Sequence, residues 1–453
     1  MTGISGRIRS ARRLVGAGAL AFCAALAGPP CPAAAKSLIR DAEIEATLRR
    51  IAAPIFRAAG LGRNSVKIYI INDRDMNAFV AGGRNLFINS GMLQRLKTPQ
   101  EIQAVIAHEV GHITGGHLAR TAELSRGLSG AAAIGMLLAG AAAASGNGQA
   151  ATAIALSTQN AAQRGFLAHS RAQEAAADQA SVRYMVGAGS DPQAILDVLS
   201  IFRGQEALRA GRMDPYAQTH PLFSRRYSLL EEAVGNSPVG KPTSPELAQA
   251  HARMVAKFEG FQRTPGRVLS ETPKTDTGEI ATLRRAIAWH RLADRKKAAA
   301  AMARLLRLSP EDPYYHELHG QFLLENGQAR AAVAAYRRAT DLAPDEALLQ
   351  AGLGRALLAV NSPAADRQAL KVLQSARRSD GADARMLRDL ALAYARAGRP
   401  ADASLITAER YMLLARFTDA ALHAKRAAGQ FSEGSAGWLR AQDILRDARR
   451  ARR

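Results

Sequence analysis

The sequence predicts an α+β protein that is mainly helical, in which a domain with a small β-sheet precedes an α-solenoid of paired helices. Three observations support this prediction. Capping residues that mark the N-terminus of a helix recur along the chain. Short β-rich runs are confined to residues 66–88, and a residue pattern repeats at a spacing of 34 from residue 308 onward. With 453 residues, of which 47% are hydrophobic, the chain is long enough for two or three domains.

Residues 1–35 have the order of a secretory signal. Four arginines precede an uncharged apolar run at residues 14–27, and the small residues Ala33 to Ala35 follow two prolines. As a helix this run would span about 21 Å, less than the roughly 30 Å hydrocarbon core of a bilayer. We therefore expect an exported chain, with an uncleaved anchor as the alternative. Both cysteines, Cys23 and Cys31, lie in this segment, so the remaining chain can hold a metal only through His and carboxylate groups.

Residues 36–236 are expected to form the first folded domain. A helix is predicted over residues 41–60 and a strand over residues 66–71, and two apolar runs around Gly82-Gly83 predict a hairpin. The predicted helix starts are Thr98-Pro99, where Glu101 completes a capping box, Ser170-Arg171, and Asp191-Pro192. The Ala/Gly-rich stretch at residues 130–155 is open to three interpretations: a lid, a hairpin that touches a membrane, or a buried helix pair.

Residues 237–277 predict a linker with one helix near residues 245–261, because proline, glycine, serine and threonine are frequent there. Residues 278–453 then repeat themselves. Residues 308–312 recur as 342–346 and Gly320 recurs as Gly354, always 34 positions later. This period, with Tyr336 late in a second helix, resembles the tetratricopeptide repeat and predicts a solenoid. A copy at residue 390 is displaced by three residues, and the next is expected early, near Ala408.

The motif that points to chemistry is His108-Glu109-Val110-Gly111-His112, which follows the Thr98 cap on a helix with an apolar stripe. Residues four apart share one helix face, so His108 and His112 can both reach one zinc ion at roughly 2.0 to 2.1 Å. Glu109 projects beside them, where a carboxylate can take a proton from water and deliver it to a leaving amine. The motif therefore predicts one Zn²⁺ per chain and hydrolysis, if a third ligand exists.

The third ligand is expected from a second helix. His117 lies five residues after His112, rotated about 140° around the helix, so it is expected to support a ligand from behind or to lie on the surface. Glu174 supplies a carboxylate and would complete the coordination, while Asp178, one turn further on, could accept the outer N–H of a ligand histidine. Without the histidine motif, Glu174 and Asp178 would be interpreted as charged side chains on a solvent-exposed face of their helix.

The motif at residues 108–112, together with residues 171–178, resembles the zinc metallopeptidase family that contains HtpX and the CAAX prenyl endopeptidases. The other segments that resemble its pattern are Asn77-Ala78-Phe79, Gly82-Gly83, residues 90–93, Thr219-His220-Pro221 and Arg226. The resemblance implies a zincin-type metallopeptidase domain. With a signal-like segment before it and tetratricopeptide-like repeats after it, the chain is similar to the BepA-like periplasmic branch of this family.

The resemblance implies an exported zinc-dependent endopeptidase that degrades misfolded or misassembled envelope proteins in the periplasm, with a repeat domain for substrates or for the outer-membrane assembly machinery. An exposed strand within residues 84–89 could bind extended substrate by β-augmentation. His220 could stabilise an oxyanion, fill the fourth zinc position at rest, or be structural. Arg226 would add positive charge if it reaches the site, and is otherwise a surface residue.

The chain is strongly basic, with 61 lysines and arginines against 39 acidic residues and a net charge of +22. No aromatic-interleaved basic patch or reader motif accompanies this charge, which argues against nucleic acid as a partner. Peripheral contact with an anionic membrane, acidic partners, or a compositional bias toward arginine remain as explanations. The alternative function is a chaperone or assembly scaffold that acts mainly through its repeats, with latent proteolysis.

Overall fold

The structure is a computed structural model that describes residues 37–62, 65–121, 123, 170–203, 216, 220 and 224–452. Three sequence predictions fall outside these residues: the signal-like segment at 1–35, the stretch at 130–155, and Thr219 with Pro221. Among the described residues, no helix is both long enough and apolar enough to cross a membrane.

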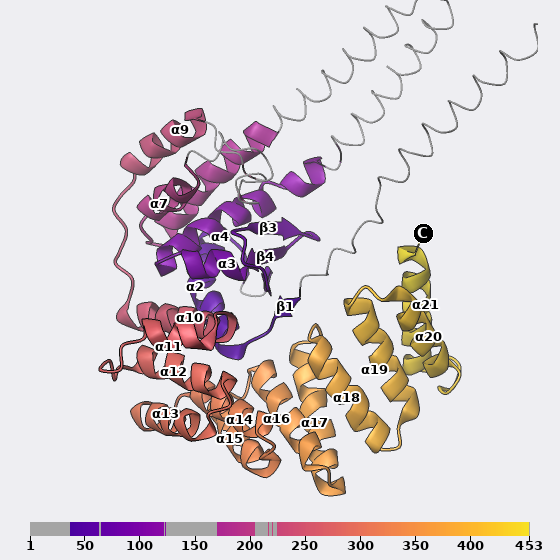
Figure 1. Cartoon of the computed structure of the whole chain (residues 1–453). Coiled ribbons are helices and arrows are strands. Elements are labelled where there is room, and N and C mark those ends of the chain that lie inside the picture. Colours follow the sequence, from indigo (N-terminus) through magenta and orange to yellow (C-terminus); the bar gives the residue numbers. More distant parts are fainter. Residues whose placement is uncertain are drawn as a thin grey trace, which may run out of the picture. The chain divides into compact units, whose positions relative to one another are not determined.

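The described residues are mainly helical and include one small sheet (Figure 1). The elements of the first part are β1(Leu38–Ile39), α2(Ala42–Ala58), β2(Lys67–Ile71), β3(Ala78–Ala81), β4(Asn85–Asn89), α3(Ser90–Arg95), α4(Pro99–Thr114), α7(Gln193–Phe202), α9(Ser224–Gly235), α10(Pro245–Gln262) and α11(Pro265–Glu271). Residues 117–121 and 170–187 are also helical. The second part contains α12(Glu279–Arg291), α13(Arg295–Leu308), α14(Pro313–Glu325), α15(Ala329–Leu342), α16(Ala347–Val360), α17(Pro363–Ser379), α18(Ala384–Arg396), α19(Pro400–Leu413), α20(Phe417–Ala428) and α21(Ala436–Ala451).

The sheet has the strand order β1-β2-β4-β3, in which β2 runs parallel and β3 antiparallel to β4. The predicted hairpin around Gly82-Gly83 is confirmed, and both glycines have positive φ angles, 57° and 89°, which glycine adopts without strain. The prediction of an exposed strand within residues 84–89 is wrong. These residues form β4, whose backbone groups are paired by β2 on one side and β3 on the other, so β3 occupies the edge of the sheet.

Helix α4 begins where the sequence predicts. The Thr98 hydroxyl accepts from the backbone N–H of Glu101 at 3.2 Å, and the Glu101 carboxylate accepts from the backbone N–H of Lys97 at 2.7 Å. The helix is buried nearly all around, and Ile106 and Val110 are fully excluded from solvent. Packing of α4 against β3, α2 and α7 therefore fixes the helix that carries the histidine motif.

The other two predicted helix starts differ in detail. Ser170 is already helical instead of flanking its helix as a cap. At the third start, the Asp191 carboxylate accepts from the backbone N–H of Gln193 at 3.0 Å, and α7 begins at Gln193, directly after Pro192. Both helices exist as predicted, and only their first residues move.

The segment predicted as a linker with one helix holds two helices, α10 and α11. The second begins because Pro265 occupies its first turn, where the missing N–H costs no hydrogen bond. Helix α10 is packed on several sides. Met254 and Phe258 belong to the core around α4, while Ala256 belongs to the core of the first repeat helices. The segment therefore joins two cores instead of separating them.

Two cations of α10 are buried among carboxylates. The Lys257 ammonium lies 2.7 Å from Asp41, 3.3 Å from Glu43 and 3.8 Å from Glu317, and its side chain is only 1% exposed. Arg253 contacts Glu43 and Asp312, both at 2.6 Å. These ion pairs tie α10 to the start of α2 and to α14.

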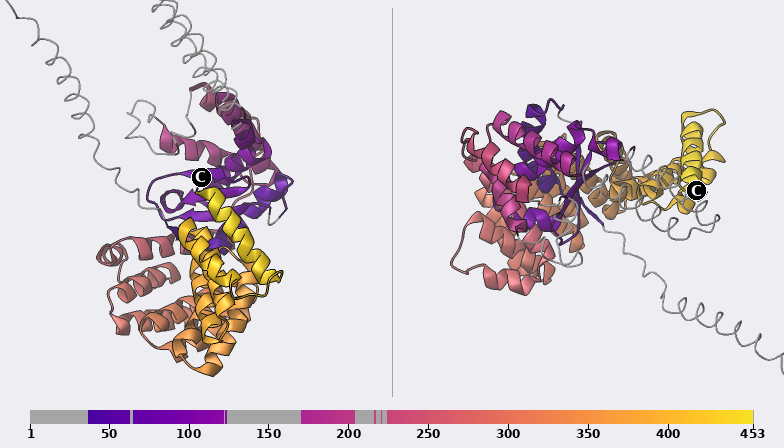
Figure 2. Two further views of the ribbon diagram at one scale, coloured as in Figure 1. Left: turned by 90° about the vertical axis from the view of Figure 1, so that its right-hand side faces the viewer. Right: turned by 90° about the horizontal axis from the view of Figure 1, so that it is seen from above.

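Helices α12 to α21 follow one another as antiparallel pairs (Figure 2). Helix α16 begins 34 residues after α14, and the Tyr336 ring fills the space above Gly320 and Gly352, as expected of tetratricopeptide-like repeats. Helix α18 begins 37 residues after α16, which confirms the three-residue displacement. The early copy expected near Ala408 is wrong, because this residue lies inside α19, the second helix of its pair.

Candidate metal centre

The centre is built on one face of α4, where the i and i+4 spacing places His108 and His112 one above the other. Their Nε2 atoms lie 3.1 Å apart, and the two rings meet edge to face. Both side chains are buried, and so is Glu109 between them. Two nitrogen atoms are thus held close together in a site with little access to solvent.

Gly111 explains how a second helix reaches these histidines. A β-carbon at Gly111 would lie 2.9 Å from both the Cα and the carbonyl oxygen of Ala177, closer than real contacts allow. The helix at residues 170–187 therefore packs directly on the backbone of α4. Glu174, one turn before Ala177 on that helix, reaches the histidines: its two oxygens lie 3.3 Å from His112 Nε2 and 3.4 Å from His108 Nε2.

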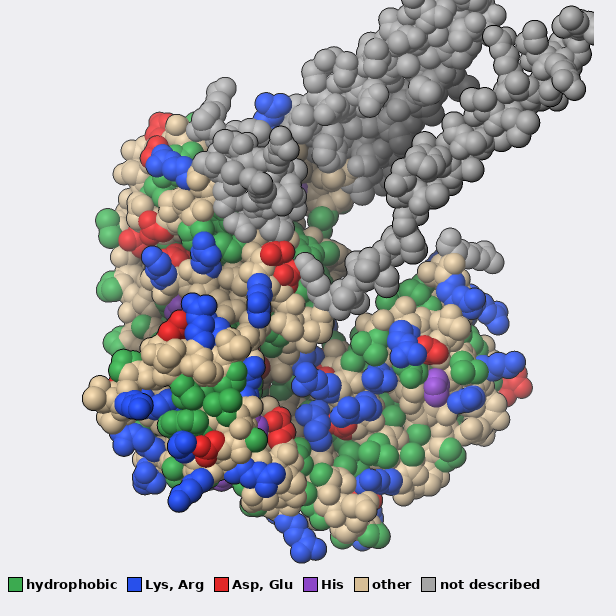
Figure 3. Space-filling view, in the orientation of Figure 1, with side chains coloured by type: hydrophobic (Ala, Val, Ile, Leu, Met, Phe, Trp, Pro, Cys, Tyr) green, Lys and Arg blue, Asp and Glu red, His purple; other side chains and the backbone are tan. Residues whose placement is uncertain are grey.

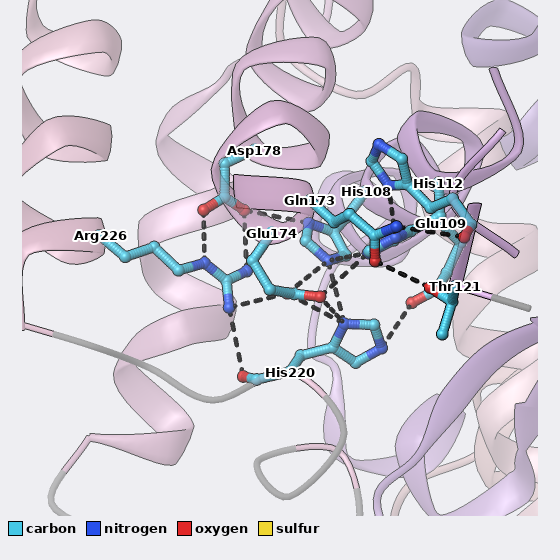
Figure 4. A network of polar contacts seen from close by, with 10 residues as sticks. His108, Glu109, His112, Thr121, Gln173, Glu174, Asp178, His220 and Arg226 are labelled. Atoms are coloured by element: carbon cyan, nitrogen blue, oxygen red, sulfur yellow. Dashed lines mark hydrogen bonds and ion pairs between the residues drawn. The ribbon is translucent and has the colours of Figure 1, made fainter. Parts of the chain in front are cut away.

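His220 joins this group from a distant part of the chain (Figure 4). Its Nδ1 lies 3.1 Å from both oxygens of Glu174 and 3.3 Å from His108 Nε2. The ring packs on that of Tyr216 with a centroid separation of 4.7 Å. Of the alternatives left open for His220, the geometry disfavours a purely structural residue, since its nitrogen faces the other donor atoms.

The four residues fit one metal ion. In five of the six pairs among His108, His112, Glu174 and His220, donor atoms lie 3.1 to 3.4 Å apart, and all four residues offer donor atoms within 4.8 Å of one another. A tetrahedral ion with ligands at about 2.0 to 2.1 Å would place the donors about 3.3 to 3.4 Å from one another. Imidazole nitrogens with a carboxylate oxygen form a donor set suited to zinc.

Asp178 and Arg226 lie directly behind the donors. Asp178 Oδ1 lies 3.0 Å from His108 Nδ1, the nitrogen that points away from the other donors. Arg226 Nη2 donates to Asp178 Oδ1 at 2.8 Å, Nη1 lies 3.0 Å from Glu174 Oε2, and Nη1 also donates to the His220 carbonyl at 3.2 Å. Arg226 is buried, so the surface alternative is excluded. Its guanidinium therefore contacts two of the donor residues, Glu174 and His220, as well as Asp178.

The side chain of Glu109 is fully buried, and neither of its oxygens has a hydrogen-bond partner among the described residues. Oε1 lies 3.4 Å from His220 Nε2. Burial raises the pKa of Glu109 to about 7, against the opposing charges of His108 and His112. Such a carboxylate can take up and release a proton near neutral pH.

Glu174 is in the opposite condition. Burial alone would raise its pKa, but hydrogen bonds from His108, His112 and His220 outweigh burial and hold the pKa far below its usual range. Asp178 behaves similarly, because the charge and hydrogen bonds of Arg226 lower its pKa against the effect of burial. Both carboxylates are therefore ionised at neutral pH, as a metal ligand and its supporting groups need to be.

His117 is buried, and its Nδ1 lies 2.9 Å from His112 Nδ1. Of the two alternatives for this residue, the geometry favours support of a ligand over a surface position. Two contributions could not be seen in the sequence. Gly111 has no side chain to suggest close packing, and Tyr216 belongs to no motif at all.

Comparison with known proteins agrees with this geometry. Residues 39–234 match the family model described as peptidase family M48. The beta-barrel assembly-enhancing protease of Escherichia coli K12 is 27% identical over 311 residues, covering 66% of this chain and 63% of that protein. The mitochondrial metalloendopeptidase OMA1 of Schizosaccharomyces pombe is 28% identical over 195 residues, covering 43% of this chain and 54% of that protein.

The beta-barrel assembly-enhancing protease of Yersinia pestis is 25% identical over 316 residues, covering 69% of this chain and 64% of that protein. The chain thus spans a little under two thirds of the length of these relatives. Among solved structures, the tetratricopeptide protein YrrB aligns with a TM-score of 0.31 and 18% identity, covering 39% of this chain and 91% of that one.

Proposed function

We propose that residues 39–234, which form a domain of peptidase family M48, make this chain a zinc-dependent endopeptidase. The observation that supports this most directly is the convergence of four donor atoms beside a buried carboxylate that makes no hydrogen bond to any described residue. A structural zinc site needs only the donors. The additional carboxylate of Glu109 is what a hydrolytic site requires.

His108, His112 and Glu174 would hold the metal, and Asp178 would orient the His108 ring through its Nδ1–H. When bound there, zinc would polarise the scissile carbonyl and make water acidic enough to attack near neutral pH. Arg226 keeps Glu174 and Asp178 in place through its charge and hydrogen bonds. These roles follow from the positions of the side chains.

Glu109 would act as the general base. It accepts a proton from the attacking water on one carboxylate oxygen and then donates it to the leaving amine of the cleaved peptide. Its burial beside the donor atoms suits both transfers, because burial opposes the charged form and so favours uptake of the proton from water.

His220 would complete the donor set at rest. Catalytic zinc sites keep one coordination position open for water or substrate. Because His220 Nδ1 lies with the other donors, the imidazole has to leave this position before substrate can enter. We therefore propose that the site is latent in this conformation. In the open form, the same ring could help to stabilise the oxyanion.

The substrates proposed are unfolded or misassembled envelope proteins, met in the periplasm after export of the chain. The similarity to the beta-barrel assembly-enhancing proteases supports this class of substrate. Strand β3 at the edge of the sheet offers backbone groups to an extended peptide, which selects unfolded chains over folded domains. The tetratricopeptide-like repeats would bind substrates or partners, including the outer-membrane assembly machinery.

The basic face of the repeats supports contact with acidic partners or an anionic membrane. Figure 3 shows Lys and Arg side chains spread over the visible surface of the repeat helices, with fewer Asp and Glu between them. Such a surface attracts anionic groups over a distance set by the ionic strength.

The test is cleavage of casein or of an unfolded β-barrel precursor by the purified chain, with zinc content measured on the same sample. We expect about one zinc per chain, loss of cleavage with a chelator, and recovery with added zinc. Glu109→Gln should retain the metal and lose cleavage. If the protein contains no zinc and cleavage survives chelation, the proposed function is wrong.

A second candidate is a chaperone or scaffold with latent proteolysis, which the inward position of His220 favours. The two candidates differ in cells. If Glu109→Gln supports all cellular function of the chain, the scaffold is the better account, whereas loss of function with this variant supports the peptidase.

A further inference from the structure

We propose that His117 is the positioning residue for the metal ligand His112, which it orients by accepting a hydrogen bond from the outer nitrogen of that imidazole. This inference rests on the proposed function in one respect, namely that His112 binds the metal through Nε2. It assigns a role to a histidine that is not itself one of the four donors.

The two rings are placed for a single hydrogen bond. His117 Nδ1 lies 2.9 Å from His112 Nδ1, and the rings meet nearly at right angles, with centroids 4.9 Å apart and an interplanar angle of 81°. The N···N separation is within the range of a hydrogen bond between ring nitrogens. The contact lies on the outer side of the His112 ring. On the other side, His112 Nε2 lies 3.3 Å from Glu174 among the metal donors.

The backbone is shaped to hold His117 there. Helix α4 ends at Thr114, and Gly116 takes a φ of 64°, which turns the chain back toward the helix end. The His117 ring then occupies the space beside Gly115: a β-carbon on Gly115 would lie 2.3 Å from its Nε2. An ordinary side chain at residue 115 would push the ring aside.

A second contact links His117 to the helix that carries Glu174. The Gln173 side-chain amide donates to the His117 carbonyl at 3.1 Å, and Thr121 donates to the carbonyl oxygen of the same amide at 3.1 Å. Gln173 directly precedes Glu174, so the position of His117 and that of the carboxylate ligand are fixed by one local network. This contact holds the backbone of His117 beside the helix that carries Glu174.

The direction of the hydrogen bond follows from the metal. A ligand imidazole offers the lone pair of Nε2 to the ion, so its proton has to reside on Nδ1. His117 Nδ1 is then the acceptor and keeps its own proton on Nε2. The opposite direction would place a proton on His112 Nε2, in the middle of the donor cluster. Each histidine of the motif thus has its own outer acceptor: Asp178 for His108, and His117 for His112.

The experiment compares His117→Asn with His117→Leu in the full chain. Asparagine retains an acceptor near the position of Nδ1, whereas leucine retains bulk without an acceptor. Zinc affinity is measured by competition with a chelating dye, and the absorption spectrum of bound Co²⁺ reports the ligand geometry. We expect leucine to weaken zinc binding roughly 10-fold to 100-fold and to alter the Co²⁺ spectrum. Asparagine should remain within a few-fold of the unmodified chain.

Two further variants separate orientation from packing. His251→Leu is the matched control, since His251 is also buried but lies on α10, away from the donors, and it should leave zinc affinity unchanged. Gly115→Ala should displace the His117 ring and weaken zinc binding, but it should add nothing in the His117→Leu background. The comparison of asparagine with leucine at residue 117 remains available if Gly115→Ala folds poorly.

The inference is overturned if His117→Leu binds zinc as tightly as the unmodified chain, or if asparagine and leucine weaken binding equally. It is also overturned if Gly115→Ala acts independently of residue 117. If the unmodified chain cleaves substrate and holds stoichiometric zinc, and the variants bind zinc as tightly as it does, only this inference is rejected. Absence of zinc in the unmodified chain would reject the proposed function as well.

Discussion

Replacing Gly111 by alanine tests whether the direct packing of two helices sets the position of the Glu174 ligand. The new β-carbon would lie 2.9 Å from the Cα and carbonyl oxygen of Ala177. Ordinary contacts between carbon atoms are about 3.5 Å or more, so the helix at residues 170–187 has to move away by about 0.6 Å. Metal–ligand distances tolerate only about 0.2 Å. The shift therefore exceeds what the Glu174 carboxylate can absorb without loss.

The expected result is at least about a tenfold loss of zinc affinity, equivalent to about 1.4 kcal/mol. The free energy of unfolding of the metal-free chain is a separate quantity with its own expected change. Overpacking costs about 1–3 kcal/mol, and alanine gains about 1 kcal/mol over glycine inside a helix, so a net loss of about 0–2 kcal/mol remains. Zinc affinity is measured by chelator competition, and stability by urea unfolding in the presence of chelator.

Gly187→Ala is the matched control, because Gly187 lies on the same helix but its β-carbon would meet the side chain of Ala58 at 3.2 Å, and none of the donors. It should leave zinc affinity unchanged. Ala177→Gly should not rescue Gly111→Ala, since the contacting atoms of Ala177 belong to the backbone. If Gly111→Ala binds zinc like the unmodified chain, the distance between the helices does not control the ligand.

Three further predictions follow from buried groups. The raised pKa of Glu109, from 4.5 to about 7, means that the folded metal-free chain retains a proton that the unfolded chain releases, so stability falls as pH rises through this window. Glu109→Gln should therefore stabilise the metal-free chain by about 2–3 kcal/mol at pH 8 and much less at pH 5, in urea unfolding with chelator present. Lys257→Met should cost about 3–5 kcal/mol in the same assay, because three carboxylates lose their buried cation. Gly352→Ala should cost about 1–3 kcal/mol, because its β-carbon would lie 2.3 Å from the Tyr336 ring.

Each of these predictions has its own control and its own contradicting result. An equal effect of Glu109→Gln at both pH values would mean that the carboxylate is not protonated in the folded chain. The exposed Lys274→Met should be neutral beside Lys257→Met, and similar losses in the two variants would contradict the role of the buried charges. For Gly352→Ala, recovery of stability by Tyr336→Leu would support the contact, whereas additive losses would count against it.

Local patterns predicted the parts of the site that depend on local structure. The capped helix at Thr98 places His108 and His112 on one face by helical geometry alone, and the acidic spacing of Glu174 and Asp178 on a second helix suggested how that helix would contribute. His220 was singled out only by resemblance, because no periodicity connects it to the histidine motif.

Other features had no local signal. The position of β4 inside the sheet depends on parallel pairing with β2, and that choice is made by tertiary packing. The ion pairs of Lys257 with Asp41 and Glu43 join residues more than two hundred positions apart, so local patterns indicate only a polar linker around it. Gly116 turns His117 back onto His112, yet in the sequence this glycine looks like a simple helix end.

Helix α10 has a wider consequence, since it contributes side chains to two cores at once. A protein cut after this helix would leave half of it bare, with Lys257 and Arg253 stripped of their partners on α14. The last two helices, α20 and α21, instead pack with one face of α19 in a separate cluster. Changes in the distal helices would therefore leave the first two cores intact, whereas the proximal repeats are coupled through α10 to the domain that carries the candidate metal centre.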